Sequence, residues 1–248
     1  MGLSFDTISG SGPNGAIIHY KPDPETCAVV KRDQMYLCDS GGQYRDGTTD
    51  VTRTFHFGTP TDYEKRCFTR VLQGHIAIDR AVFPATTTDA TLPPGFSLDI
   101  LARAPLWRDG LDYRHGTGHG VGSFLNVHEG PQGIGYRPYC HEVPLMEGMT
   151  ITNEPGYYED GQFGIRIENV LLVHKVKTPQ QFANVDYLGF ENVTMVPIHK
   201  KLIDVDLLSP EERQWVDEHH RQCFERVSPL LAKDGPAYAW LERETSPL

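Results

Sequence analysis

Two segments of the chain share one pattern, and this repetition constrains the fold more than any other feature. In each segment an apolar run ends at an acidic residue, a turn containing glycine follows, and a returning run carries a second acid. The acids are Asp39 and Asp50 in the first segment, and Glu154 and Glu168 in the second. The apolar and polar alternation around them predicts β-hairpins. We therefore expect two related halves whose four acids meet where the halves join.

Short apolar runs predict the strands of the first half. Residues 16–20 follow a turn signal at 13–15 and read as a strand. Residues 35–38 form a second strand that runs into Asp39, and the alternation at 51–57 predicts the strand that returns beside it.

Capping signals predict the helices. Thr61 and Glu64 form a capping box before apolar residues at helical spacing, so a helix should begin there. Residues 96–107 are a weaker candidate. Ser209 precedes a proline and two acids, which predicts the start of a tail helix, and a last short helix should begin at Pro236. The apolar face of the tail either closes the core or meets another subunit.

Composition excludes some classes of function. The 248 residues include 23 Lys plus Arg against 33 Asp plus Glu, a net charge of −10, so no basic excess exists to neutralise nucleic-acid phosphates. No stretch approaches the roughly 20 apolar residues of a membrane span. Five cysteines, an odd number without a Cys-x-x-Cys pair, predict reduced thiols in a cytoplasmic protein. We therefore expect neither a nucleic-acid nor a membrane partner.

The four acids need partners if they lie beside buried strands. An ordinary surface position would explain any one of them alone. Together the case differs, because Asp39, Glu154 and Glu168 follow or interrupt apolar runs and clustered carboxylates repel one another. Arg53 and Arg166 supply too little positive charge to offset four carboxylates. Two divalent cations would balance them, and with one imidazole the oxygen-rich set favours Mn²⁺ over a thiolate-type zinc site.

Four histidines lie next to glycines or strand ends. They are His19, His115, His119 and His128. His115 and His119 are four residues apart, but the glutamate of a helical His-Glu-x-x-His zinc site is missing between them. The glycines around these two histidines instead predict a tight turn where the backbone passes close to a ligand.

Several motifs together resemble the Xaa-Pro aminopeptidases (aminopeptidase P), most of all the eukaryotic cytosolic type. The motifs cover nearly the whole chain and lie at 39–44, 47–54, 115–122, 126–131, 153–158, 164–169 and 240–245. The resemblance implies a pita-bread fold of the α+β class, in which two pseudo-symmetric halves surround a dinuclear metal site. We expect a catalytic domain at 1–204 and a C-terminal helical extension at 205–248 that packs on it or on a partner subunit.

The family's metal ligands fall on the same four acids and one histidine. By this resemblance Asp50 and Glu168 bridge the two metals. Asp39 serves one metal, and His119 with Glu154 serves the other. The implied cofactor is two divalent ions per chain, with Mn²⁺ favoured.

The resemblance also implies a reaction. The enzyme hydrolyses the bond between any N-terminal residue and a following proline, by attack of a hydroxide that bridges the metals. Glu154 is the expected proton shuttle, and His128 the group that stabilises the oxyanion. Substrate contacts fall on His19, His115 and His128, and we group Arg166 with them. The scissile bond has no N–H, so the site must recognise the shape of the proline ring.

The start of the chain departs from the family pattern. Catalytic domains of this family usually have further helices and a strand before the segment that matches 16–20, and the cytosolic enzymes carry two more N-terminal domains. We therefore expect the first helices to be missing, as in a truncated product or one piece of a three-domain enzyme. Two alternatives follow: a non-catalytic metal-binding or interaction module of the same fold, and a prolidase-type Xaa-Pro dipeptidase. A homodimer is left open.

Overall fold

A computed structural model describes residues 1–85, 94–137 and 143–248. Within them the strands are β1 (Gly2–Leu3), β2 (Ile8–Ser11), β3 (Met35–Ser40), β4 (Gly42–Gln43), β5 (Val51–His56), β6 (Phe83–Pro84), β7 (Gly118–His119), β8 (Gly133–Ile134), β9 (Thr150–Asn153), β10 (Gly156–Glu159), β11 (Phe163–Arg166), β12 (Asn169–Val176) and β13 (Tyr187–Asn192). The α-helices are α1 (Asp62–Asp79), α2 (Pro94–Trp107), α3 (Pro210–Val227) and α4 (Pro236–Thr245). Short 3₁₀ helices are η1 (Gly12–Ala16), η3 (Phe182–Asn184), η4 (Lys200–Leu202), η5 (Val205–Leu207) and η6 (Ser228–Leu230).

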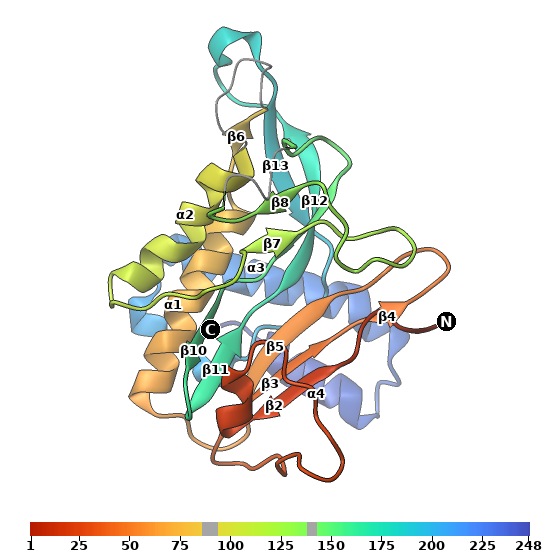
Figure 1. Ribbon diagram of the computed structural model, residues 1–248, viewed down its shortest axis with the longest axis vertical. Coiled ribbons are helices and arrows are strands. Elements are labelled where there is room, and N and C mark those ends of the chain that lie inside the picture. Colours follow the sequence, from red (N-terminus) through yellow and green to blue (C-terminus); the bar gives the residue numbers. More distant parts are fainter. Residues whose placement is uncertain (86–93, 138–142) are drawn as a thin grey trace.

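Two antiparallel sheets form the two halves of the molecule. The first has the order β2-β3-β5 and the second the order β6-β13-β12-β9 (Figure 1). Both predicted hairpins are confirmed, because β3 pairs with β5 in one half, while β9 pairs with β12 and β10 with β11 in the other. Each of the four acids therefore lies in, or next to, a strand near the junction of the sheets.

Helices α1 and α2 pack closely on each other beside the second half. Residue Gly74 of α1 makes this possible, because a Cβ atom there would lie 2.1 Å from the carbonyl oxygen of Ala102 in α2. The core around the pair includes Leu72 and Leu106, both buried. The start of α1 is as predicted, with a complete capping box between Thr61 and Glu64.

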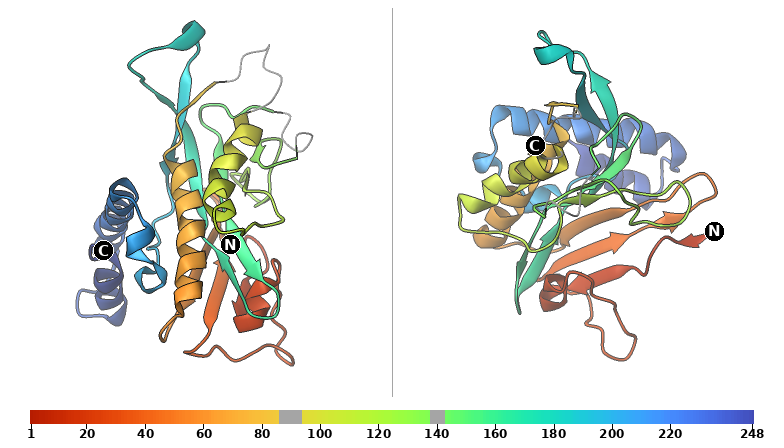
Figure 2. Two further views of the ribbon diagram at one scale, coloured as in Figure 1. Left: turned by 90° about the vertical axis from the view of Figure 1, so that its left-hand side faces the viewer. Right: turned by 45° about the horizontal axis from the view of Figure 1, so that its top comes forward.

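The C-terminal helices lie on the outer side of α1 (Figure 2). The predicted cap of α3 is confirmed, since Ser209 and Glu212 form a second capping box. Trp215 of α3 donates a hydrogen bond of 2.6 Å from its indole nitrogen to Asp79 of α1, so α3 packs on this chain. The domain boundary between residues 204 and 205 stays a prediction.

The predicted strand at 16–20 is wrong. Gly12, whose φ is +54°, and Pro13 start the 3₁₀ helix η1, and the chain then turns through residues 17–20. The strand that pairs with β3 is instead β2, just before this helix. The apolar run lacks a strand partner, and Ile17 is exposed.

The cysteines and the helices bear on two further expectations, reduced thiols and the lack of a membrane span. Cys27, Cys38, Cys67 and Cys223 carry free thiols, and Cys140 lies outside the described residues. None of the helices in the described ranges combines the length and apolarity that a bilayer crossing requires.

Candidate metal centre

The four predicted acids gather around one cavity of about 650 Å³ between the two halves. Asp39 lies in β3, and Asp50 comes directly before β5. Glu154 follows β9, and Glu168 lies between β11 and β12. The cavity is also lined by all four predicted histidines and by Arg166. The fold thus brings together four acids that are up to 129 positions apart, from 39 to 168.

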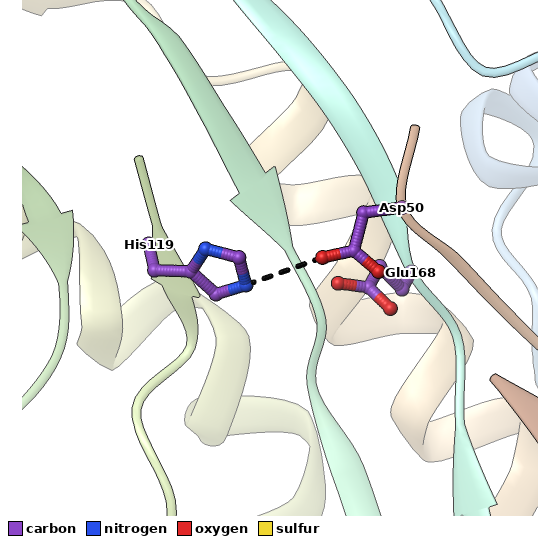
Figure 3. A group of neighbouring side chains, drawn as sticks. All are labelled: Asp50, His119 and Glu168. Atoms are coloured by element: carbon purple, nitrogen blue, oxygen red, sulfur yellow. Dashed lines mark ion pairs between the residues drawn. The ribbon is translucent and has the colours of Figure 1, made fainter. Parts of the chain in front are cut away.

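Three of the five predicted ligands form a compact group. Ligand atoms of Asp50, His119 and Glu168 all lie within 4.8 Å of one another, and Figure 3 shows the imidazole facing the two carboxylates. The Nε2 atom of His119 is 3.5 Å from Asp50 Oδ2 and 3.5 Å from Glu154 Oε1. Its Nδ1 atom lies 2.9 Å from the carbonyl oxygen of Gly120, so the lone pair of Nε2 is available to coordinate a metal.

Asp39 lies at the other end of the acidic cluster, beside Arg166. Its Oδ2 accepts a hydrogen bond of 2.7 Å from the Nη2 of that arginine. Its Oδ1 is buried and has no hydrogen-bond partner in the described part of the chain. A buried carboxylate oxygen without a partner is costly, so this atom points to a ligand of the site.

Three residues that the sequence analysis did not single out hold the site together. Thr52 donates to Glu168 at 2.7 Å, and its hydroxyl accepts from Arg166 Nε at 3.1 Å. Thr152 accepts from the backbone N–H of His119 at 2.9 Å. Tyr158, the third, is described with the histidines below. Thr52 could have been found from its position two residues after Asp50, because alternate residues of a strand share a face.

The predicted substrate-contacting histidines line the same cavity at different depths. His115 Nδ1 lies 2.7 Å from the carbonyl oxygen of Gly116, so its Nε2 accepts from the hydroxyl of Tyr158 at 2.9 Å. Tyr158 in turn accepts from Arg166 Nη1 at 2.8 Å. His19 and His128 are exposed, and the ring centroids of His128 and His119 are 4.1 Å apart.

The glycine-rich histidine segment bends at residues 115 and 117 and then forms a short strand. Gly118 and His119 form β7, and a Cβ atom on Gly118 would lie 1.9 Å from the carbonyl oxygen of Thr152. The close approach that the glycines allow is therefore to β9, which carries Glu154 at its end. This packing sets the spacing between His119 and Glu154.

Burial and mutual repulsion raise the pKa values of the clustered carboxyls. Burial, followed by the charges of Glu168, Asp39 and Glu154, raises the pKa of Asp50 to about 10. Burial and the nearby Asp39 raise the pKa of Glu168 to about 8. The pKa of Glu154 is also raised well above its ordinary value, first by burial and then by Glu168. Carboxyls in this state gain most from a multivalent cation, so the donor set fits divalent metal ions.

The metal-free chain is expected to lose stability as pH rises above neutrality. Asp50 and Glu168 ordinarily titrate at 3.8 and 4.5 but hold their protons to about pH 10 and about pH 8 when folded, by their raised pKa values. The stabilisation is complete below the ordinary values and is lost as pH rises through the raised ones. His115 and His119, whose pKa values burial lowers to about 3 and about 4, oppose this only below about pH 6.5.

Calorimetry of the chelator-treated chain between pH 6.5 and 8.5 measures this effect. The expected loss is roughly 3–5 kcal/mol, or about 6–20 °C in Tm. Saturating Mn²⁺ should remove the loss, because the metal displaces the same protons. A metal-free Tm that rises across this interval would contradict the assignment of the buried acids.

Comparisons with known proteins place this site in context. A model of metallopeptidase family M24 matches residues 1–175, and a model of the C-terminal region of peptidase M24 matches residues 186–248. A protein of Laccaria bicolor named "Probable Xaa-Pro aminopeptidase P" is 68% identical over 247 residues, covering 100% of this chain and 38% of that protein. A protein of Tuber melanosporum with the same name is 59% identical and is covered to 39%.

Solved structures agree with the fold. The X-prolyl aminopeptidase of Caenorhabditis elegans, described as a cytosolic enzyme with a di-nuclear active site, aligns with a TM-score of 0.90 and 41% identity. The alignment covers 99% of this chain and 39% of that one. The prolidase of Pyrococcus furiosus aligns with a TM-score of 0.59 and 31% identity, over 68% of this chain and 46% of that one. The predicted α+β fold of two related halves is confirmed, and the chain spans about two fifths of the length of these first relatives.

Proposed function

The chain belongs to metallopeptidase family M24, and from this premise we propose that it carries the catalytic site of a metal-dependent Xaa-Pro aminopeptidase. The fold that carries the site is the pita-bread fold of the Xaa-Pro aminopeptidases. The proposed reaction is hydrolysis of the bond between any N-terminal residue and a following proline. The observation that carries it is the convergence of Asp50, His119 and Glu168 within 4.8 Å, in a cavity that the other predicted site residues also line.

Two divalent ions would be held by the five predicted ligands. These are Asp39, Asp50, His119, Glu154 and Glu168. The unpartnered Oδ1 of Asp39 and the raised pKa of Glu168 support this set. The oxygen-rich chemistry supports Mn²⁺ as the metal. When bound, such ions make water acidic enough to supply hydroxide near neutral pH and polarise a carbonyl oxygen.

The residues around the ligands would bind the peptide and move its protons. Glu154 is largely buried, and its raised pKa suits a group that takes a proton from water and gives it to the proline nitrogen. His128, on the exposed side of the cavity, would donate to the developing oxyanion. His19 and His115 would contact the substrate, and Arg166 would hold Asp39 and Tyr158 in place.

The cavity also offers apolar surface for the proline ring. Its lining includes Phe5, Ile18, Tyr20 and Val127 alongside the polar groups. A proline imide has no N–H to donate, so contact with the ring must supply the selectivity. These side chains therefore suit peptides with proline at the second position.

The test is hydrolysis by the purified, Mn²⁺-loaded protein. An Xaa-Pro-Xaa tripeptide should lose its first residue, as followed by mass spectrometry, whereas the matched Xaa-Ala-Xaa peptide should stay intact. A folded, metal-loaded sample without turnover would sink the proposal and leave a non-catalytic module of the same fold.

A dipeptidase is the second candidate, and the alignment with archaeal prolidase favours testing it. An Xaa-Pro dipeptide distinguishes the two, because a dipeptidase would cleave it much faster than the tripeptide. The cytosolic description of the worm enzyme supports a cytoplasmic location, and a homodimer is part of the same proposal.

A further inference from the structure

A buried arginine lies directly behind the candidate metal centre. Arg53 belongs to β5, three residues after Asp50, and is 3% exposed. Its neighbour Thr52 points into the site and bonds Glu168, so Arg53 points to the opposite face of the strand. Figure 1 shows α3 crossing behind the strands on this side.

All five N–H donors of the Arg53 guanidinium find acceptors. Nη1 donates to the carbonyl oxygens of Thr52 at 2.9 Å and Glu168 at 2.6 Å. Nη2 donates to Asn169 Oδ1 at 2.7 Å and to the carbonyl oxygen of Val196 at 2.6 Å, and Nε donates to that of Pro197 at 3.1 Å. A rigid planar fork that bonds three separate chain segments fixes their spacing, and one of these segments carries Glu168.

The segment that carries Val196 and Pro197 is itself held by helix α3. We call residues Val196–Ile198 the strap. His219 Nε2 lies 2.9 Å from the carbonyl oxygen of Val196, and His220 Nε2 lies 3.1 Å from both backbone polar atoms of Ile198. Both histidines are buried. Helix α3 and Arg53 therefore both bond the strap, and the carbonyl oxygen of Val196 is a partner of both.

Helix α3 is in turn fixed on helix α1. The ring of His219 stacks on Trp215 with centroids 5.3 Å apart, and Trp215 donates to Asp79 of α1. A continuous series of contacts thus runs from α1 through α3 and the strap to Arg53, and from there to the backbone of Glu168.

The charge of Arg53 also bears on the site. None of its five acceptors is a carboxylate, although a buried guanidinium is costly without a counter-charge. Burial lowers its pKa to about 10, while Cys223 and Glu168 act in the opposite sense, so the group is a cation at neutral pH. Arg53 therefore binds the backbone of Glu168, and its charge also stabilises the carboxylate of the same residue.

We propose that Arg53 is a positioning residue that fixes Glu168 for metal binding, and that α3 supports it through the strap. This gives the C-terminal region a role in the chemistry of the site without contact to metal or substrate. The inference rests on the proposed function, since it presupposes that Glu168 is a ligand.

The test uses Co²⁺ as a spectroscopic probe of the metal-free chain. Arg53→Lys keeps the charge, but one ammonium cannot reach five acceptors. Its Co²⁺ affinity, measured by calorimetry, should fall about 10- to 100-fold, the usual effect of losing a group that orients a ligand. The visible absorption bands of bound Co²⁺ should change shape, which a loss of fold stability alone would not cause.

Arg70→Lys is the matched control. Arg70 is a second buried arginine, in α1, and it bonds Asp109 and Gln73 rather than any residue of the site. This variant should keep the wild-type Co²⁺ affinity and spectrum.

A second variant tests the helix and serves if Arg53→Lys does not fold. His219→Phe keeps a ring on Trp215 but loses the bond to Val196, so Co²⁺ affinity should fall about two- to fivefold. In the double variant the loss of Co²⁺ affinity should be smaller than the product of the two single losses, because both changes act through the strap.

The outcomes separate this inference from the proposed function. Wild-type affinity and spectrum in a folded Arg53→Lys would overturn the role of Arg53, and wild-type affinity in His219→Phe would overturn the role of α3. In either case, metal-dependent cleavage of the Xaa-Pro-Xaa peptide by the parent chain would still uphold the proposed function. A wild-type chain that binds no Co²⁺ overturns both.

Discussion

Glu168→Gln is expected to abolish metal-dependent hydrolysis and to weaken metal binding by at least about 100-fold, while the metal-free chain becomes more stable. The side chain is 1% exposed and belongs to the compact group with Asp50 and His119. Glutamine removes the negative charge that offsets two cations. It also removes the repulsion that raises the pKa values of the remaining acids, and Thr52 can still donate to the amide oxygen.

The opposite signs of these two effects make the result specific. Metal affinity is measured by calorimetry and stability by thermal unfolding in chelator. Glu191→Gln, a change of an exposed acid on β13, is the control and should alter neither. Near-normal activity in Glu168→Gln would remove this residue from the site, and a large loss of metal-free stability would show that its role is structural.

Arg166→Met is expected to lower the free energy of unfolding by about 3–5 kcal/mol, the usual result of removing one partner of a buried ion pair. The Arg166 side chain is 2% exposed, and its guanidinium bonds Asp39, Tyr158 and Thr52 at 2.7–3.1 Å. Without it, Asp39 would lose the hydrogen bond to its Oδ2, beside an Oδ1 that has no partner among the described residues. Denaturant unfolding of the metal-free chain measures the loss.

Arg166→Lys separates the charge from the geometry. It keeps a cation near Asp39 but cannot bond all three partners, so Tyr158 and with it His115 should shift. Activity on the tripeptide should fall about 100-fold, as small misplacements of a catalytic group do. Arg221→Lys on exposed α3, where the arginine pairs with Glu218 and Glu225, should cost under about 1 kcal/mol and leave activity unchanged. Equal behaviour of the two lysine variants would exclude a positioning role for Arg166.

Local signals predicted the helices best. The capping boxes at Thr61 and Ser209 located the starts of α1 and α3, because both side chains of each box lie within one turn of the backbone they satisfy. The strand prediction at 16–20 failed because strand formation needs a partner elsewhere in the chain. Gly12 and Pro13 favoured a turn at that point, and β2 took the place beside β3.

The same contrast holds in the site. Asp39, Glu154 and Glu168 were predicted because each follows or interrupts an apolar run, and Asp50 because it lies on the returning run of the first hairpin, patterns visible within a few residues. The roles of Tyr158 and Arg53 were not predicted, because each depends on a partner over 40 residues away. The partner of Tyr158 is His115, and that of Arg53 is Glu168. Sequence patterns thus identified the groups that carry charge, while the structure was needed to find those that orient them.

Turnover as a function of bound metal tests the central claim most directly. The metal-free chain should be titrated with Mn²⁺, bound metal counted by elemental analysis, and release of the first residue from an Xaa-Pro-Xaa peptide followed on the same samples. We expect about two ions per chain at saturation, no turnover in chelator, and activity that appears with metal occupancy. A folded chain that reaches this occupancy without cleaving the peptide, or that cleaves it equally well in chelator, would contradict the account.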